Sequence, residues 1–174
     1  MHRYLCIVLL VFTIASCNKK GKDERKYVSP AETQENMIKA NRVLVKKDRQ
    51  RIAGTVERNG WDMAETETGM WFEVLSEGSG DSIVEGNQVS LNYTLSLLDG
   101  RECYSSDESG PKIFTVGRGG VESGLEQGIL LCKANSKVRL ILPPHLAHGL
   151  TGDGERIPAR AILIYEIEVI NLSK

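Results

Sequence analysis

Apolar and polar residues alternate over much of the chain after Gly69, with the period of two that marks β-strands with one buried face. The longest example is Gln88 to Leu98, where every second residue from Val89 to Leu97 is apolar or aromatic. Asp99-Gly100 follows this stretch and is a strong signal for a hairpin turn. The same alternation predicts further strands near Met70 to Leu75, Glu102 to Ser105, Lys112 to Val116, Ser136 to Leu142 and Ala161 to Ile170.

One stretch within this region, Glu122 to Leu131, is instead predicted as a helix. Turn residues separate the strands around it, and Pro143-Pro144 ends the pairing of the strand before them. Several strands with one helix between them predict an α+β domain at residues 61–174, in which an antiparallel sheet wraps around a single helix.

A second, amphipathic helix is predicted ahead of this domain, at residues 30–60. Ser29-Pro30 is typical of a helix start and Asn59-Gly60 of a helix end. One face of this helix is apolar. The opposite face is basic, and we interpret it as exposed to solvent. The alternative is a helix that binds a partner or forms a homodimer. Its apolar residues recur at helical spacing, at Met37, Ile38, Leu44, Val45, Ile52 and Val56.

The first part of the chain, residues 1–16, has the pattern of a secretory signal peptide, with a basic start and an apolar run from Leu5 to Ala15. This run is too short to span about 30 Å of hydrocarbon as a helix. Ile14-Ala15-Ser16-Cys17 resembles the lipobox of bacterial lipoproteins. The resemblance implies that Cys17 is acylated and anchors the protein to the lipid bilayer of the bacterial cell envelope. Residues 17–29 are polar and charged and are predicted to form a flexible tether.

Composition and charge limit the partners, disulfides and metal sites that the chain can have. The net charge of -1 gives no overall field toward nucleic acid. Cys103 and Cys132 are the cysteines left after Cys6 and Cys17, and their lack of framework spacing favours two buried free thiols, although export makes a disulfide feasible. No metal set and no nucleophile–base spacing stands out, so we expect neither metal nor cofactor.

Four segments of the predicted domain resemble FKBP-type peptidyl-prolyl isomerases in order and spacing. They read VSLNYTLSLLDGRECYSS, FTVGRGGVESGLEQGILLC, LILPPHLAHG and IPARAILIYEIEVINL, and the match runs from about Gly69 to Leu172. Together with the lipobox and the preceding helix, they are similar to the lipoprotein branch of this family, which includes gliding-associated isomerases. The resemblance implies a bent five-stranded antiparallel sheet wrapped on the Glu122 to Leu131 helix.

The resemblance also implies a proline-binding pocket between that helix and the sheet, with the backbone N–H of Glu122 holding the carbonyl of the ligand. The expected partners are proline-containing segments of extracytoplasmic proteins, and the expected reaction is cis–trans isomerisation of X-Pro bonds. Carried over position by position, the catalytic pocket is lined by Tyr93, Phe114, Val121, Glu122, Leu125, His148, Ile157 and Tyr165.

This reaction needs no nucleophile, metal or cofactor. Resonance gives the peptide bond a rotational barrier of ~18–20 kcal/mol, and exchange before proline takes tens to hundreds of seconds. A twisted amide has lost that resonance and is less polar than either planar form. An apolar, dry pocket therefore stabilises the twisted state relative to water.

The chain departs from the family at several pocket positions. Leu125 stands where the family has tryptophan, His148 where it has tyrosine, and Glu122 where it has isoleucine. Cys103 and Tyr104 replace a phenylalanine and an aspartate after the hairpin. Replacing tryptophan by leucine removes aromatic contact area for a proline ring. We therefore expect a weaker isomerase, and the alternative is a binding or chaperone module without catalysis.

Overall fold

The computed structural model describes residues 29–173, so the predicted signal peptide, the lipidated Cys17 and nearly all of the tether lie outside the described residues. The described chain forms one long helix, α1 (Pro30–Asn59), and a body of strands with short helices. The body contains β1 (Ala64–Glu65), β2 (Trp71–Ser76), β3 (Gln88–Leu97), β4 (Glu102–Ser105), α2 (Ser106–Ser109), β5 (Lys112–Thr115), α3 (Ser123–Ile129), β6 (Lys137–Leu142), η1 (Pro144–Leu146) and β7 (Leu163–Ser173).

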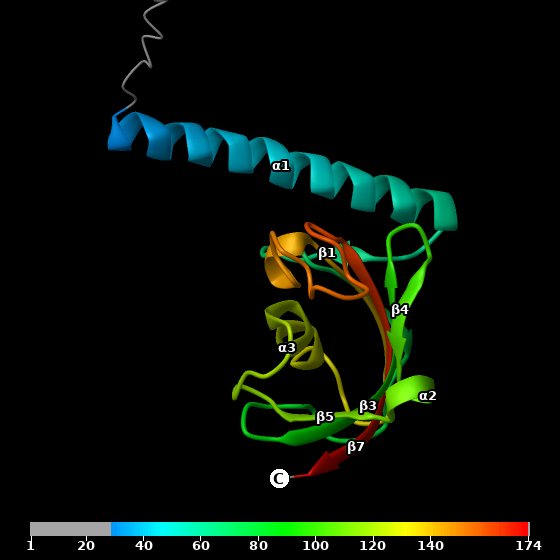
Figure 1. The fold of residues 1–174 in the computed structure, drawn as a ribbon. Coiled ribbons are helices and arrows are strands. Elements are labelled where there is room, and N and C mark those ends of the chain that lie inside the picture. Colours follow the sequence, from blue (N-terminus) through cyan, green and yellow to red (C-terminus); the bar gives the residue numbers. More distant parts are fainter. Residues whose placement is uncertain (1–28, 174) are drawn as a thin grey trace, which may run out of the picture. The chain divides into compact units, whose positions relative to one another are not determined.

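The strands of the described chain form one antiparallel sheet in the order β1-β2-β6-β7-β3-β4, with β5 also paired to β3. Strand β3 is the centre of this arrangement, because β7 pairs along its full length while β5 and β4 pair with its first and second halves. Pairing shifts register between Ser90 and Leu91 and between Leu95 and Ser96, and such irregularities increase bending. Figure 1 shows β3 and β7 curving around α3.

The predicted α+β fold is confirmed, with more elements than expected. The sheet of the described residues has seven strands, where the resemblance implied five and the alternation showed six; the short β1 is the strand that the alternation did not show. The predicted single helix of the domain is observed as α3, shortened to Ser123–Ile129, and two brief helical segments, α2 and η1, accompany it.

Helix α3 lies very close to β6 because glycines face that strand. A Cβ atom added at Gly128 would come within 2.5 Å of Leu140 Cδ1, and one at Gly124 within 2.6 Å of Leu142 Cδ2. Gly124 and Gly128 are four residues apart and so share one helix face. These two glycines therefore set the depth at which α3 sits on the sheet.

The main core fills the space between α3 and the sheet. Every second residue of β6 and β7 points to this side, which explains the alternating pattern in the sequence. The core residues that these two strands contribute are all at most 3% exposed: Val138, Leu140, Leu142, Leu163, Tyr165, Ile167 and Val169.

A smaller core lies under α1. Ile52 and Val56 of this helix form a buried cluster with Ile141, Ile162 and Ile164, which belong to the alternate positions of β6, β7 and the residue before β7. Chain contacts group the described residues from Ile38 onward into one compact unit, which excludes the first turns of α1. The second half of α1 therefore belongs structurally to the body.

Helix α1 begins where the sequence predicts, because the Glu32 N–H donates to Ser29 Oγ at 3.1 Å. Most of its predicted apolar face is not buried. Met37, Ile38 and Val45 are 68%, 46% and 42% exposed, because only Ile52 and Val56 have the apolar cluster of the sheet as a partner. Within residues 29–173, no helix is both long and apolar enough to cross a membrane.

Candidate functional site: a cleft between helix α3 and the sheet

The predicted pocket residues come together on the α3 side of the sheet. Phe114, Leu125, Ile157 and Tyr165 are members of the main core, and Tyr93 and Val121 pack against it. Glu122 and His148 contact one another through Oε1 and Nε2 at 3.1 Å, and Tyr165 donates to the same oxygen. The structure thus brings the whole predicted set together in one cluster of contacting residues between α3 and the sheet. It comes from β3, β5, β7, the start of α3 and the loops after β6.

The floor of the cleft is apolar and well packed. Leu125 and Tyr165 are 0% exposed, Ile157 is 2% and Phe114 is 8% exposed. The rings of Tyr93 and Tyr165 lie 6.0 Å apart between centroids, at an interplanar angle of 53°. This tilted arrangement is favourable for an aromatic pair. Tyr93, Val121 and His148 are partly exposed and form the rim.

A buried carboxylate crosses this apolar floor. Glu122 is the residue immediately before α3, with extended backbone, and its side chain does not cap the helix. Its Oε1 accepts a hydrogen bond from the Tyr165 hydroxyl at 2.8 Å and lies 3.1 Å from His148 Nε2. Its Oε2 lies 3.6 Å from Lys112 Nζ, and its side chain is only 8% exposed. The cleft is therefore closed by a polar cluster of Lys112, Glu122, His148 and Tyr165.

The charge states of this cluster follow from its surroundings. Burial alone would raise the pKa of Glu122, but the Lys112 ammonium and the hydrogen bonds to the carboxylate outweigh it and lower the pKa. Burial and the adjacent Glu122 charge raise the pKa of Tyr165. At neutral pH, Glu122 is therefore a carboxylate and Tyr165 a neutral hydrogen-bond donor.

Lys112 is the site residue that the sequence did not predict. Its ammonium donates to the Tyr165 hydroxyl at 3.2 Å and lies over the rings of Tyr93 and Tyr165. A lysine at the first position of a short strand is usually solvated. Only the β3–β5 register, which pairs Lys112 with Leu91, brings it to the cleft, and no local sequence signal shows that register.

The residues at the two altered positions after the hairpin support the cleft. The Tyr104 hydroxyl donates to Asp153 Oδ2 at 2.5 Å. Asp153 Oδ1 in turn accepts the backbone N–H groups of Glu155 and Ile157, at 2.9 and 2.8 Å. Cys103 is a buried free thiol, 1% exposed. Tyr104 and Asp153 therefore hold the loop that delivers Ile157 to the floor.

The hydrogen bond between Tyr104 and Asp153 shifts the pKa values of both residues. Burial opposes ionisation of Asp153, but the hydrogen bonds from Tyr104 and from two backbone N–H groups lower the pKa of Asp153 to about 2. The same hydrogen bond raises the pKa of Tyr104 to about 12. The Asp153 carboxylate and the Tyr104 hydroxyl are thus locked in their charged and neutral forms near neutral pH.

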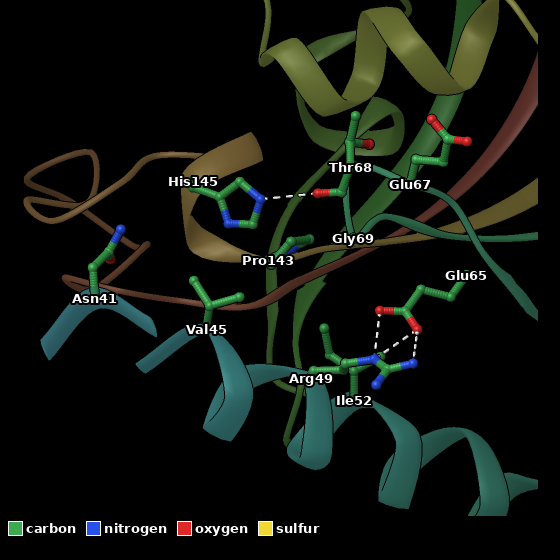
Figure 2. A pocket seen from close by; sticks show the side chains of 10 residues that line it. All are labelled: Asn41, Val45, Arg49, Ile52, Glu65, Glu67, Thr68, Gly69, Pro143 and His145. Carbon is green, nitrogen blue, oxygen red and sulfur yellow. Dashed lines mark hydrogen bonds and ion pairs between the residues drawn. The ribbon is translucent and has the colours of Figure 1, made fainter. Parts of the chain in front are cut away.

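A second hollow lies beside α1, with a volume of about 370 Å³. Figure 2 shows its residues, including the ion pair of Arg49 with Glu65 and the contact of His145 Nε2 with the Thr68 carbonyl at 3.0 Å. None of the eight predicted pocket residues lines it. Within residues 29–173, no group of three or more His, Cys, Asp or Glu side chains could hold a metal ion. The candidate site is the cluster between α3 and the sheet, because that cluster contains all eight predicted residues.

Comparisons with known proteins agree with this geometry. The model of FKBP-type peptidyl-prolyl cis-trans isomerase domains matches residues 80–170, more than half of the chain. The described structure resembles AtFKBP13 with a TM-score of 0.61 at 29% identity, covering 64% of this chain and 99% of that one. The strands and α3 that form the cleft thus fall within the matched region.

Curated relatives share the same region. FK506-binding protein 2B of Rhizopus delemar is 39% identical over 89 residues, which are 50% of this chain and 43% of that protein. A probable FKBP-type peptidyl-prolyl cis-trans isomerase of Haemophilus influenzae is 32% identical over 115 residues, 66% of this chain and 47% of that protein. The chain thus spans less than half the length of either relative. The match to the family model shows that this chain belongs to the FKBP-type peptidyl-prolyl cis-trans isomerases.

Proposed function

We propose that this protein is a peptidyl-prolyl cis-trans isomerase that assists the folding of extracytoplasmic proteins in the bacterial cell envelope. The observation that carries the proposal is the cleft itself. A buried floor of Phe114, Leu125, Ile157 and Tyr165 meets the N-terminal end of α3 at Glu122. A dry apolar floor favours the twisted amide, and an N–H at the helix start is suited to hold the preceding carbonyl.

The polar cluster predicts low activity. Entry of a proline ring must displace the Lys112 ammonium from the tyrosine rings and bring apolar atoms against a charged carboxylate. Desolvating that ion pair further costs free energy that an apolar residue at position 122 would not require. We expect catalysis, but slower than in a cleft without charges.

The test is a protease-coupled isomerisation assay on a short X-Pro peptide. We expect measurable activity in the wild type. We expect a higher kcat/KM for Glu122→Ile combined with His148→Tyr, because the first change removes the buried carboxylate and the second restores the hydroxyl of the family's tyrosine. Leu125→Trp is not used, because Leu125 is fully buried and a larger side chain would overpack the core. Tyr93→Ala, at the rim, should lower activity. Folded wild type and double variant that both lack activity would contradict the proposal.

A binding or chaperone module is the second candidate, and the closed polar cluster favours it. Such a module would slow aggregation of an unfolded client without accelerating a proline-limited refolding step. Refolding of two clients, one limited by proline isomerisation and one not, separates the two functions. Acceleration of the first client alone supports the isomerase.

Attachment to the membrane through an acylated Cys17 is part of the proposal and rests on the Ile14-Ala15-Ser16-Cys17 pattern. Acyl chains add about 0.8 kcal/mol of membrane affinity per buried CH₂, so several chains anchor firmly. In cells fed a labelled fatty acid, Cys17→Ser should lose both label and membrane attachment, whereas Cys6→Ser should keep both. Persistent attachment of Cys17→Ser would exclude this anchor.

Homodimerisation through α1 is also a proposal. Its support is the exposure of Met37, Ile38, Val43 and Val45, each above 40%. Light scattering with and without residues 30–47 tests it, and an unchanged monomer mass in the longer form would exclude it.

A further inference from the structure

The aromatic side of the cleft is covered by a cation from the chain itself. The Lys112 ammonium lies 5.2 Å from the ring centroid of Tyr93 and 5.6 Å from that of Tyr165. Both distances fall within the ~6 Å over which an aromatic face attracts a cation. An ammonium group of the chain itself therefore lies against both tyrosine rings.

The carboxylate beside this ammonium is fixed more firmly than the ammonium. The Glu122 side chain is 8% exposed and belongs to the residue just before α3, whereas the Lys112 side chain is 25% exposed. Glu122 Oε2 has no hydrogen-bond partner among residues 29–173, and Lys112 Nζ lies 3.6 Å from it. If Lys112 alone turned out to solvent, Glu122 would keep its contacts with Tyr165 and His148 at Oε1, but its buried charge would lose the cation beside Oε2, at a cost in free energy. A second cation that replaced Lys112 would avoid this cost.

The approach to the cleft is acidic. The Tyr104 hydroxyl contacts Asp153 at 2.5 Å and Glu155 at 3.4 Å. Arg156 lies over the Tyr104 ring and pairs with Glu108. One guanidinium thus accompanies three carboxylates at this edge, and the resulting field attracts cations.

We propose that the cleft takes proline segments in which Lys or Arg adjoins the proline, and that Lys112 holds the place of that side chain in the free protein. The cation of the segment replaces Lys112 between the two tyrosine rings and the Glu122 carboxylate, while its proline contacts the apolar floor. This inference rests on the proposed function, because it names the substrate class of the same cleft.

The test uses short peptides that differ only in the residue X before proline: Arg, its neutral analogue citrulline, and Glu. Binding is measured by calorimetry and isomerisation by exchange spectroscopy. For the wild type we expect the order Arg, citrulline, Glu, with about threefold between the first two. Lys112→Met should widen the Arg preference to about tenfold, because Glu122 Oε2 then has no ammonium group beside it. Glu122→Gln should abolish it.

Lys133→Met is the matched control, because Lys133 is exposed in the loop after α3 and its loss should leave the order of peptides unchanged. Equal binding of Arg and citrulline in the wild type and in Lys112→Met would overturn the inference, even with full isomerase activity. Binding with the expected order but without turnover would uphold the cation site and contradict the isomerase. A Glu preference would assign the cleft's selectivity to Lys112 itself and overturn the inference.

Discussion

One helix packs against each face of the sheet, α3 on one face and the end of α1 on the other, and the shorter helix buries the larger share of its residues. Helix α3 has seven residues, of which Gly124, Leu125, Gly128 and Ile129 are buried. Helix α1 has 30 residues, of which only Asp48, Ile52, Thr55 and Val56 are buried. The number of residues in a helix therefore says little about its part in the fold, whereas the closeness of its contact with the sheet says much.

The two faces also differ in how they treat charge. On the α3 face, Glu122 is almost fully buried and pairs with Lys112 across an apolar floor. On the α1 face, Arg49 pairs with Glu65 while its own side chain stays 67% exposed. The α1 face also holds the partly buried pairs Arg160–Asp48 and Arg139–Glu73, so what distinguishes the α3 face is that its buried pair lies among the predicted site residues.

The largest expected difference between the faces comes from matched isoleucines. Ile129 of α3 and Ile52 of α1 are 0% and 1% exposed. Ile129→Ala should lower the free energy of unfolding by about 4 kcal/mol, and Ile52→Ala by about 2 kcal/mol, because the small cluster under α1 can collapse around the cavity. Urea unfolding measures both values. Equal losses would show that the two cores are equally rigid.

Matched glycines should give the next largest effect and opposite signs. Gly128→Ala should lower the free energy of unfolding by about 2 kcal/mol, because its Cβ meets Leu140 of the adjacent strand. Gly54→Ala in α1 should raise it by up to about 1 kcal/mol, because its Cβ meets only the end of the flexible Arg58 side chain at 3.2 Å. Thermal unfolding of the two variants measures both changes. A higher stability of Gly128→Ala would contradict the close packing of α3 on β6.

A partly buried ion pair of α1 tests how much charge contributes on this face of the sheet. Arg160 Nη2 donates to Asp48 Oδ2 at 2.7 Å, and the Asp48 side chain is 10% exposed. Asp48→Ala should cost about 2 kcal/mol, as for a hydrogen bond between charged groups. Arg51→Ala serves as control, because Arg51 is 59% exposed and lies 4.0 Å from Asp48. Equal effects of both variants in urea would show that burial does not matter here.

The smallest effect is a slope of stability with pH at the edge of the cleft. The pKa of Asp153 is lowered from 3.8 to about 2, so its ionised form is favoured in the folded state. The resulting stability is present above pH 3.8 and is lost as the pH falls toward about 2. Asp153→Asn should flatten that part of the acid-unfolding curve. An unchanged curve would show that the Tyr104 contact does not form in solution.

Much of the fold could be predicted from alternation, because one face of most strands is buried. The pattern from Gln88 to Leu98 gave β3 to within one residue. Strand β1 escaped prediction, because two residues are too few to show a period. The apolar stripe of α1 showed a capacity for burial but not whether a partner exists, and most of it is exposed.

The pocket residues could be placed from the resemblance, but their interactions could not. Glu122 was predicted through its backbone, whereas the structure also gives its side chain three partners in the cleft. Lys112 was missed because its position depends on pairing between strands that are distant along the chain. Long-range register of this kind leaves no periodic trace in a short strand.

The two glycines that hold α3 close to β6 have a consequence for how the binding site of such a protein can evolve. Gly124 and Gly128 set the depth of the helix because its backbone lies close to β6 at these positions. The side chain at position 122, just before α3, is not one of the contacts that set this depth. A substitution at position 122 can therefore replace an apolar side chain by a charged one while the backbone of α3 and the sheet keeps its position. New ligand preferences can arise there at little risk to folding.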